Sequence, residues 1–454
     1  MEKGARALVT IESVAAGGSG VCHVDGMTVF VPQTCPEDQA EIRIDRVKSG
    51  CAFGTVTKLL EASPFRRIDF CPVSDRCGGC DLAHISYEKQ LTIKRQIVVD
   101  ALERIGGFTD APVCETLASP RSMRYRNKMV FPFGRDADGA LAGGFYAPSS
   151  HSLVPLTDCK QGDETVSRYL AAAIEYLQET GTSLYDELTH RGAARRLFVR
   201  LAEGTKEAMV VMTANAKKLK QPELLVEKLL SVPSPYTLTS ILFNRHTKAD
   251  NLLLGKENKV LYGRDYIEDI LGGLRFRIAA HSFYQINAPQ TENLYNTALS
   301  LADLSGHETV LDLYCGIGTI SLFAAGQAKR VIGVEIVPSA IENAKENAMR
   351  NNIKNAEFIL GSAETIAPQL AEKGIRPDVI CIDPPRKGAD AMALDAIIKM
   401  APEKVVYVSC NPATLARDAK YLCANGYSLI KSIPTDMFPN TSHIECCALL
   451  CRNR

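Results

Sequence analysis

The sequence has no segment suited to enter a membrane. Residues 1–10 contain no apolar stretch of the kind that secretion signals require, and no uninterrupted apolar run approaches the ~18 residues that span a bilayer. Internal repeats and low-complexity tracts are absent as well. A chain of 454 residues, 46% of them hydrophobic, exceeds what one core usually holds. We therefore expect a folded cytoplasmic protein of two or three domains, with no membrane partner.

The sequence also lacks an excess of charge of either sign. Its 52 basic and 52 acidic residues cancel, whereas proteins that bind nucleic acids are usually basic. An RNA partner is therefore expected only if positive charge is concentrated locally. Such concentrations occur in the middle of the chain, at residues 121–128 and 191–200, although ordinary solvated surfaces explain either run equally well.

Cysteine, by contrast, is abundant. The 15 cysteines of a long chain without a secretion signal indicate reduced thiols, metal ligands or a nucleophile, and not disulfides. Cys71, Cys77 and Cys80 lie close together, with glycines between them that allow the chain to wrap round a centre. One more thiol would complete a four-thiolate site, which suits zinc and a cubane iron–sulfur cluster equally well.

Hydrophobic periodicity divides the chain into three parts. Short alternating runs with glycine and proline breaks predict a small antiparallel barrel over residues 1–60. A helical apolar stripe predicts a helix over residues 87–105, which two glycines end. The central part, residues 61–280, has mixed strand and helix patterns and no catalytic motif. Strands that alternate with helices indicate a doubly wound parallel sheet over residues 281–454.

Three predicted strands of this sheet end in residues able to do chemistry. They lie within residues 310–321, 379–388 and 405–418. The first ends in a glycine turn, the second in Asp383 and the third in Cys410. Because ligands of an open α/β sheet bind outside the carboxyl ends of its strands, we expect these three ends to meet in one crevice.

The glycine turn predicts a nucleotide-type cofactor. Gly316 and Gly318 allow close approach of the backbone to a ligand and leave the following helix N-terminus facing it. Glu335, at the end of the next predicted strand, can bind both hydroxyls of a ribose. The third glycine of the dinucleotide fingerprint is missing and Asp312 lies within the first strand. These features favour S-adenosylmethionine over NAD.

Together these segments resemble the RNA uracil-5-methyltransferases, and in particular the branch of that family that contains an iron–sulfur cluster and modifies 23S ribosomal RNA. The N-terminal pattern resembles the TRAM domain, an OB-like RNA-binding barrel. The resemblance implies a multi-domain α/β fold: a C-terminal Rossmann-like methyltransferase domain, an N-terminal TRAM barrel and a mixed α+β central domain that carries the iron–sulfur site. It also implies that helix 87–105 packs on the methyltransferase domain.

The resemblance implies roles for individual residues as well. Cys410 is the nucleophile that adds to carbon 6 of uracil, because this addition turns the poorly nucleophilic carbon 5 into the carbon of an enolate. Glu445 occupies the position of the base that removes the carbon-5 proton after methyl transfer. The residues expected to bind S-adenosylmethionine are Gln285, Tyr314, Gly316, Gly318, Glu335 and Asp383.

Cys159 matches the fourth cysteine of the family's metal site. The expected cofactor there is a [4Fe-4S] cluster held by Cys71, Cys77, Cys80 and Cys159. Methyl transfer from a sulfonium requires no electron, and these cysteines are far in sequence from Cys410. The cluster is therefore expected to have a structural or RNA-contacting role.

The expected function is methylation of carbon 5 of a specific uridine in 23S ribosomal RNA, through a covalent cysteine–C6 adduct. The same chemistry on transfer RNA is the main alternative, although the transfer-RNA enzymes of the family generally lack the barrel and the cysteines. A non-catalytic TRAM-type RNA-binding protein would not explain Cys410 and Glu445 together. Radical methylthiotransferases require a different cysteine spacing, and amino methyltransferases require an aromatic residue where this chain has Arg386. No obligate protein partner is expected.

Overall fold

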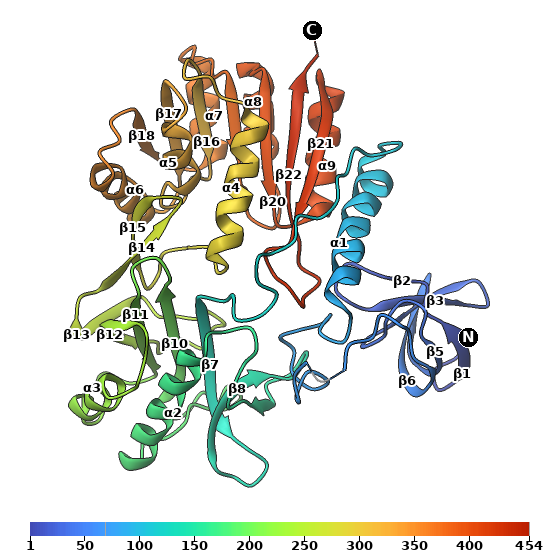
Figure 1. Ribbon diagram of the computed structural model, residues 1–454, viewed down its shortest axis with the longest axis vertical. Coiled ribbons are helices and arrows are strands. Elements are labelled where there is room, and N and C mark those ends of the chain that lie inside the picture. The colour runs from blue at the N-terminus through green and yellow to red at the C-terminus, as the bar shows by residue number, and fades with distance from the viewer. Residues whose placement is uncertain (69, 454) are drawn as a thin grey trace.

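The structure is a computed structural model that describes residues 1–68 and 70–453. It has three parts (Figure 1): an N-terminal barrel, a central sheet with two helices, and a C-terminal sheet with helices on both faces. No helix in these two ranges is long and apolar enough to cross a membrane.

The N-terminal part is a strongly curved six-stranded sheet. Its strands are β1 (Arg6–Thr10), β2 (Ser13–Val14), β3 (Gly20–Val24), β4 (Met27–Val31), β5 (Gln39–Lys48) and β6 (Cys51–Glu61). They are arranged in the order β1-β5-β6-β4-β3-β2. Alternation along β5 builds the core, because Ile42 and Ile44 are buried while Arg43 between them is exposed. Register shifts between β5 and β6 bend the pair so that the sheet curls.

The central part consists of a mixed seven-stranded sheet, a hairpin and two helices. The sheet strands are β7 (Lys128–Arg135), β8 (Leu141–Tyr146), β9 (Leu153–Pro155), β10 (Ala194–Ala202), β11 (Glu207–Ala214), β12 (Thr237–Arg245) and β13 (Glu257–Gly263). The hairpin is β14 (Tyr266–Leu271) and β15 (Leu274–Ala279), and the helices are α2 (Glu164–Glu179) and α3 (Pro222–Leu230). The strand order is β13-β12-β11-β10-β7-β8-β9. Both helices cover the face that buries Leu197, and the hairpin packs on the opposite face, which buries Phe198.

The C-terminal part alternates strands and helices. Its strands are β16 (Thr309–Leu313), β17 (Arg330–Glu335), β18 (Ala356–Leu360), β19 (Val379–Ile382), β20 (Lys404–Ser409), β21 (Tyr427–Thr435) and β22 (Glu445–Arg452). Its helices are α4 (Ala288–Ala302), α5 (Thr319–Ala325), α6 (Pro338–Arg350), α7 (Ala363–Glu372), α8 (Ala391–Met400) and α9 (Pro412–Ala424).

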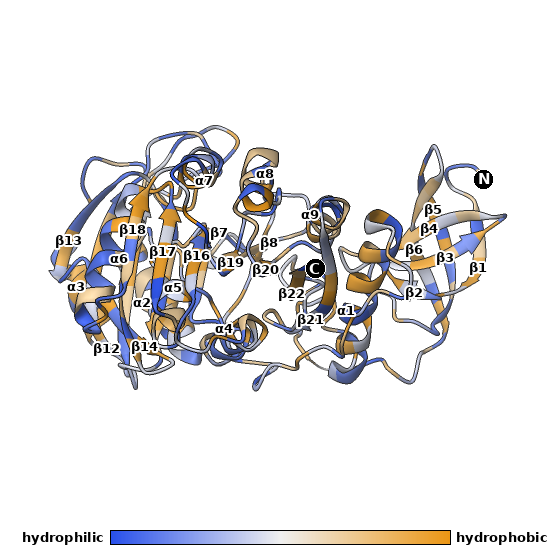
Figure 2. Ribbon diagram, turned by 90° about the horizontal axis from the view of Figure 1, so that it is seen from above, coloured by the Kyte–Doolittle hydropathy of each residue, from blue (hydrophilic) through white to orange (hydrophobic). Residues whose placement is uncertain are grey.

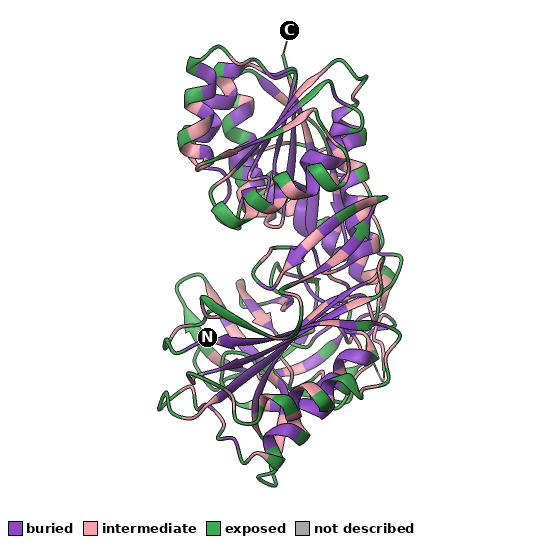
Figure 3. Ribbon diagram, turned by 90° about the vertical axis from the view of Figure 1, so that its left-hand side faces the viewer, coloured by how far each residue is buried: buried purple, intermediate pink, exposed green. Residues whose placement is uncertain are grey.

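This C-terminal sheet has the order β18-β17-β16-β19-β20-β22-β21. The first five of these strands run parallel, and β22 is antiparallel to both of its neighbours. Helices α4, α5 and α6 bury one face and α7, α8 and α9 the other. Apolar strands therefore lie between two helix layers (Figure 2), and the strands are the most deeply buried elements (Figure 3).

A helix from the N-terminal half packs on this C-terminal part. Helix α1 (Tyr87–Ala101) continues into a π-helical turn, η1 (Leu102–Gly106), which ends where Gly107 adopts a φ of 74°. Its apolar stripe, which includes Ile93 and Ile97, is buried against α9 and β21. The chain therefore crosses from the barrel to the C-terminal sheet before it forms the central sheet (Figure 1).

A buried ion pair fixes this crossing. Lys94 of α1 donates to Asp436 with Nζ and Oδ1 2.5 Å apart, and both side chains are 0% exposed. Lys94 also donates to the carbonyl of Phe438 at 3.0 Å. Two charges removed from water stabilise little as a pair, but each depends on the other for compensation.

Replacing Lys94 with Met should lower the free energy of unfolding by about 3–5 kcal/mol, because Asp436 is left buried without a counter-charge. Urea unfolding monitored by circular dichroism measures the change, and adding Asp436→Leu should recover most of it. Arg104→Met is the matched control, since its ion pair with Asp100 is exposed and contributes at most about 1 kcal/mol. A loss for Lys94→Met no larger than the control's would contradict the prediction.

Candidate active site

A cavity of about 590 Å³ lies at the carboxyl ends of β16, β19 and β20. It brings together most of the residues that the sequence singled out for cofactor binding and catalysis. These are Gln285, Tyr314, Gly316, Glu335, Asp383, Cys410 and Glu445. Gly318 lies outside the lining and is the N-cap residue of α5.

The turn after β16 has a conformation that favours glycine. Tyr314, Gly316 and Gly318 have φ values of 69°, 57° and 83°. A Cβ on Gly316 would meet nothing within 4 Å, whereas one on Gly318 would lie 3.1 Å from Ala344 and Phe358. Gly316 therefore leaves the cavity wall open, and Gly318 allows α5 to pack closely on its neighbours.

Glu335 is fixed in orientation at the end of β17. Its Oε2 accepts the backbone N–H of Gly316 at 3.1 Å and its Oε1 accepts that of Val337 at 2.8 Å. Ile336 beside it lines the cavity and is 62% exposed. A carboxylate next to an exposed apolar side chain fits a nucleoside, whose ribose hydroxyls bind the acid and whose base covers the apolar surface.

Asp312 lies beneath the glycine turn and does not line the cavity. Its Oδ2 accepts the hydroxyl of Ser321 at 2.5 Å, which ties β16 to α5. Burial raises the pKa of Asp312 to about 7.

Cys410 lies between β20 and α9, with a half-buried thiol. Asn411 caps α9 and donates from Nδ2 to the carbonyl of Arg386 at 2.9 Å, so that the strand end and the loop after β19 are held together. Burial raises the pKa of Cys410 to about 11, and the nearby Glu445 and Asp383 add to this while Arg386 opposes it. The resting sulfur is therefore a thiol.

Glu445 is the first residue of β22 and is 4% exposed. The antiparallel register pairs Ser409 with Cys446 across β20 and β22, which places Glu445 beside Cys410. Burial and the neighbouring Asp383 raise the pKa of Glu445 well above its usual range. Burial likewise raises the pKa of Asp383 to about 7.

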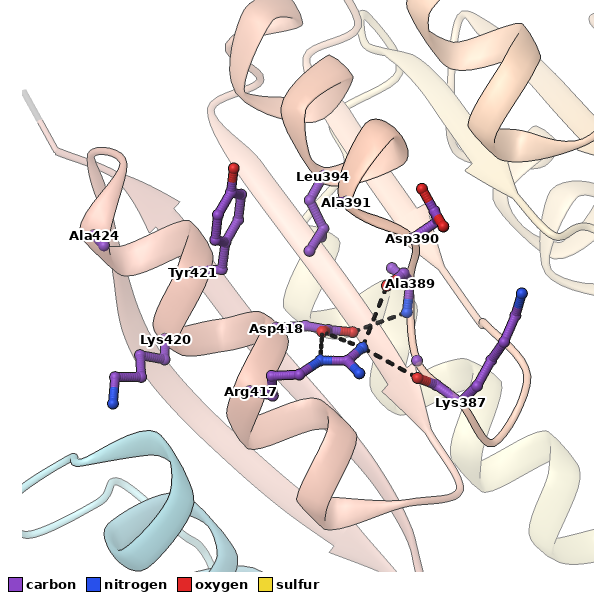
Figure 4. Close-up of a pocket in the computed structure, with 11 residues that line it drawn as sticks. Lys387, Ala389, Asp390, Ala391, Leu394, Arg417, Asp418, Lys420, Tyr421 and Ala424 are labelled. Carbon is purple, nitrogen blue, oxygen red and sulfur yellow. Dashed lines mark hydrogen bonds and ion pairs between the residues drawn. The ribbon is translucent and has the colours of Figure 1, made fainter.

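Arg386 is a cation at the cavity, on the loop after β19. This loop is braced from behind, at a separate cavity of about 760 Å³ next to α8 and α9 (Figure 4). There Asp418 accepts the backbone N–H of Ala389 at 2.8 Å, and Arg417 donates to the carbonyl of Lys387 at 3.1 Å. Side chains of α9 thus hold the loop that presents Arg386.

Three further residues of the lining were not singled out from the sequence. Phe283 is 67% exposed, and the rings of Phe438 and His443 pack edge to face at 6.0 Å. Phe283 precedes Gln285 by two residues and His443 precedes Glu445 by two residues. This spacing next to predicted site residues is the signal that could have identified them; nothing comparable marks Phe438.

A third cavity, of about 710 Å³, contains the four predicted metal ligands. Cys71, Cys77, Cys80 and Cys159 all line it as free thiols. Burial, with smaller contributions from the neighbouring Cys159 and Cys77, raises the pKa of Cys80 to about 12. Gln161 donates from Nε2 to the sulfur of Cys80 at 3.1 Å.

A partly buried arginine adjoins these thiols. Arg126 lines the same cavity near Cys80 and Cys159, and its Nε has no hydrogen-bond partner among the described residues. Within the same residues, no group of three or more His, Cys, Asp or Glu side chains is arranged so that it could hold a metal ion. The four thiols and the Arg126 guanidinium, with its unpartnered Nε, suit a centre of net negative charge. Four thiolates around iron produce such a centre.

Comparisons with known proteins agree with this geometry. The family described as tRNA (Uracil-5-)-methyltransferase matches residues 237–453, and the TRAM domain matches residues 2–57. An uncharacterized RNA methyltransferase of Halalkalibacterium halodurans is 44% identical over 443 residues, which cover 97% of this chain and 96% of that protein. One from Clostridium tetani is 44% identical over 440 residues, with 97% and 95% covered.

Among solved structures, the Pyrococcus abyssi tRNA (uracil-54, C5)-methyltransferase in complex with S-adenosyl-L-homocysteine is similar over 98% of this chain and 99% of its own. The TM-score is 0.78 and the identity 26%. Full-length relatives, both family matches and this fold agree. The chain therefore belongs to the RNA (uracil-5-)-methyltransferase family and has a TRAM domain at its N-terminal side.

Proposed function

We propose that the protein methylates carbon 5 of a uridine in RNA with S-adenosylmethionine, through a covalent bond between Cys410 and carbon 6. The observation that carries this proposal is that Cys410, Asp383 and Glu445 line one cavity together with Glu335 and Gly316. Membership of the family and the bound S-adenosyl-L-homocysteine of the archaeal relative support the cofactor.

The cofactor, when bound, supplies an electrophilic methyl group on a sulfonium. Glu335 is oriented to accept both ribose hydroxyls, and Ile336 offers an apolar surface to the adenine. Gln285 and Tyr314 line the same part of the site in this proposal. The remaining wall, with Cys410 and Glu445, receives the uracil. This division places the methyl donor and the acceptor carbon in one water-poor space.

In the proposed reaction the Cys410 thiol loses its proton to water, the resulting thiolate forms a bond to carbon 6, and the electrons of the 5,6 double bond move toward oxygen 4. Carbon 5 then takes the methyl group, and the donor leaves as a neutral thioether. Glu445, as the carboxylate, removes the proton from carbon 5, the double bond re-forms and the carbon–sulfur electrons return to Cys410. Arg386 favours both charged forms, because it lowers the pKa of Cys410 and of Glu445.

The outer face of the barrel suits RNA. The rings of Phe30 and Phe53 lie 5.6 Å apart, and Arg46 and Lys48 lie 4.4 and 5.6 Å from the centre of the Phe53 ring. Aromatic side chains with adjoining cations bind unpaired bases by stacking and phosphates by charge. The local cluster accounts for RNA binding by a chain whose net charge is zero.

For the substrate we propose 23S ribosomal RNA, with transfer RNA as the second candidate. Transfer-RNA enzymes of the family are expected from sequence to lack the N-terminal barrel and the cysteines. The Pyrococcus abyssi transfer-RNA enzyme is similar over 98% of this chain, so the barrel does not distinguish the two substrates. The four cysteines remain the argument for ribosomal RNA.

We further propose that Cys71, Cys77, Cys80 and Cys159 hold a [4Fe-4S] cluster. Such a cluster with four thiolates carries net negative charge, which the partly buried Arg126 beside it would compensate. Zinc is the alternative occupant of four thiolates. In either case the centre takes no part in the electron movements of methyl transfer.

The covalent mechanism predicts trapping by RNA that contains 5-fluorouridine. Fluorine at carbon 5 permits attack by Cys410 and methyl transfer, but it cannot leave as a cation, so the adduct persists. Denaturing gels should show a stable protein–RNA band that requires S-adenosylmethionine. Cys410→Ala should abolish the band and turnover while the protein still binds S-adenosylmethionine. A band with Cys410→Ala, or none with RNA that the enzyme methylates, would contradict the mechanism.

The substrate assignment predicts where 5-methyluridine disappears. In a strain that lacks the gene, mass spectrometry of nuclease fragments should show loss of the modification from 23S ribosomal RNA at one site or more. The wild-type gene should restore it and the Cys410→Ala gene should not. Loss from transfer RNA alone would establish the second candidate instead.

The cluster predicts iron. Protein purified without oxygen should be brown and contain about four irons per chain, as measured by elemental analysis and absorbance. Cys159→Ser should lower the iron content strongly. Cys51→Ser is the matched control, because this half-buried thiol lies on the barrel strand β6. One zinc per chain without iron would overturn the assignment.

A further inference from the structure

Residues 436–444, which connect β21 to Glu445 at the start of β22, are called the base loop here. The loop has no regular structure, yet most of its residues are buried. His443, near its end, lines both the active-site cavity and the cysteine cavity. The base loop therefore forms part of the wall between the two cavities. A buried loop needs partners for its polar groups, and those partners decide its shape.

The start and the middle of the base loop are held by residues outside the segment 71–81, which carries three of the cysteines. Lys94 binds Asp436 at the start. In the middle Asn440 has a φ of 67°, donates its backbone N–H to Gln90 at 2.9 Å and accepts from Arg67 at 2.7 Å. These contacts fix the first five residues of the loop but leave the four residues before Glu445 to other partners.

The end of the base loop is held by Asp81, the residue that follows Cys80. Ser442 donates its backbone N–H to Oδ1 of Asp81 at 2.8 Å and its hydroxyl to Oδ2 at 2.5 Å. Both oxygens of the carboxylate are thus engaged by one residue, three positions before Glu445. Gly18 of the barrel packs directly against the Asp81 carboxylate, since a Cβ on Gly18 would lie 2.5 Å from Oδ2 of Asp81.

We propose that Asp81 is a positioning residue for the catalytic base. It couples the cysteine segment, residues 71–81, to Glu445, so that release of the methylated RNA depends on the shape of that segment. This inference rests on the proposed function, in which Glu445 removes the carbon-5 proton. It gives the cysteine site a role in the reaction that requires no electron transfer.

The coupling acts on one step. Cys410 is presented by β20 and α9, and Glu335 by β17, so neither depends on the base loop. Displacement of Glu445 therefore leaves thiol addition and methyl transfer intact. It slows only the removal of the carbon-5 proton, the re-formation of the double bond and the return of the carbon–sulfur electrons to Cys410. The species that accumulates is the methylated covalent adduct.

The test measures adduct formation and adduct release separately, in single turnovers with ordinary uridine RNA and S-adenosylmethionine. Asp81→Ala and Ser442→Ala each weaken the contact between these two residues. Glu445→Gln removes the base and shows how the enzyme behaves when release of the adduct is fully blocked. Asp75→Ala is the matched control, because Asp75 lies in the same segment with a side chain that is 75% exposed. Metal content and the unfolding midpoint are measured for every variant.

We expect Asp81→Ala and Ser442→Ala to form the adduct at the wild-type rate and to release it about tenfold more slowly or worse, as for a misplaced catalytic group. The double variant should be no slower than Asp81→Ala alone, because Asp81→Ala already removes both bonds to Ser442 and Ser442→Ala removes only the hydroxyl bond. Asp75→Ala should behave as wild type. The Ser442→Ala single variant guards against loss of the metal site in Asp81→Ala, since Ser442 is outside the cysteine segment.

Wild-type release by Ser442→Ala, or equal slowing of formation and release in both variants, would overturn the role of Asp81. Absence of any adduct with wild-type protein and 5-fluorouridine RNA would instead overturn the proposed function. The two failures are therefore distinguishable.

Discussion

The antiparallel pairing of β22 with β20 decides where the reactive groups of this protein lie. Parallel strands deliver Cys410 and Asp383 to the same edge of the sheet, but Glu445 reaches that edge because it begins a strand that runs the other way. In this antiparallel register, the first residue of β22 lies opposite the residue that follows β20. The start of β22 is held in place by the base loop and by the packing of α1. The loop itself is anchored at Asp436, Asn440 and Ser442.

Electrostatics within the cavity follow from the same arrangement. Burial raises the pKa values of Asp383, Glu445 and Cys410. Asp383 also raises the pKa of Glu445, and both carboxyl groups raise the pKa of Cys410. Arg386 is the cation that opposes these effects. Its position depends on the brace that α9 provides to the loop after β19 (Figure 4).

Much of the C-terminal site could be predicted from the sequence, because its signals are local. The glycine turn, Glu335, Asp383 and Cys410 each follow a strand-like run, and parallel topology makes strand ends converge. Glu445 is identified only by the family resemblance. No local pattern marks this residue, because its position beside Cys410 depends on the pairing of β20 with β22.

Other features depend on tertiary structure and could not be read from periodicity. Asp81 and Ser442 are separated by most of the chain, and nothing near either residue indicates that they meet. The parallel pairing of β11 with β12 inside a mainly antiparallel sheet is likewise a property of the whole central part. The sequence of the π-helical turn at the end of α1 is that of an ordinary helix. The turn packs on α9, and this tertiary contact is not visible in the sequence.

The position of β22 also bears on how the protein is made. It lies between β20 and β21, two strands that precede it in the sequence. A growing chain folds from its N-terminal side, so β20 and β21 emerge while the place between them is still empty. Until residues 445–452 have been synthesised, β20 keeps an unpaired edge and Cys410 lacks Glu445 beside it. Closure of the sheet and completion of the catalytic pair are therefore a single folding event.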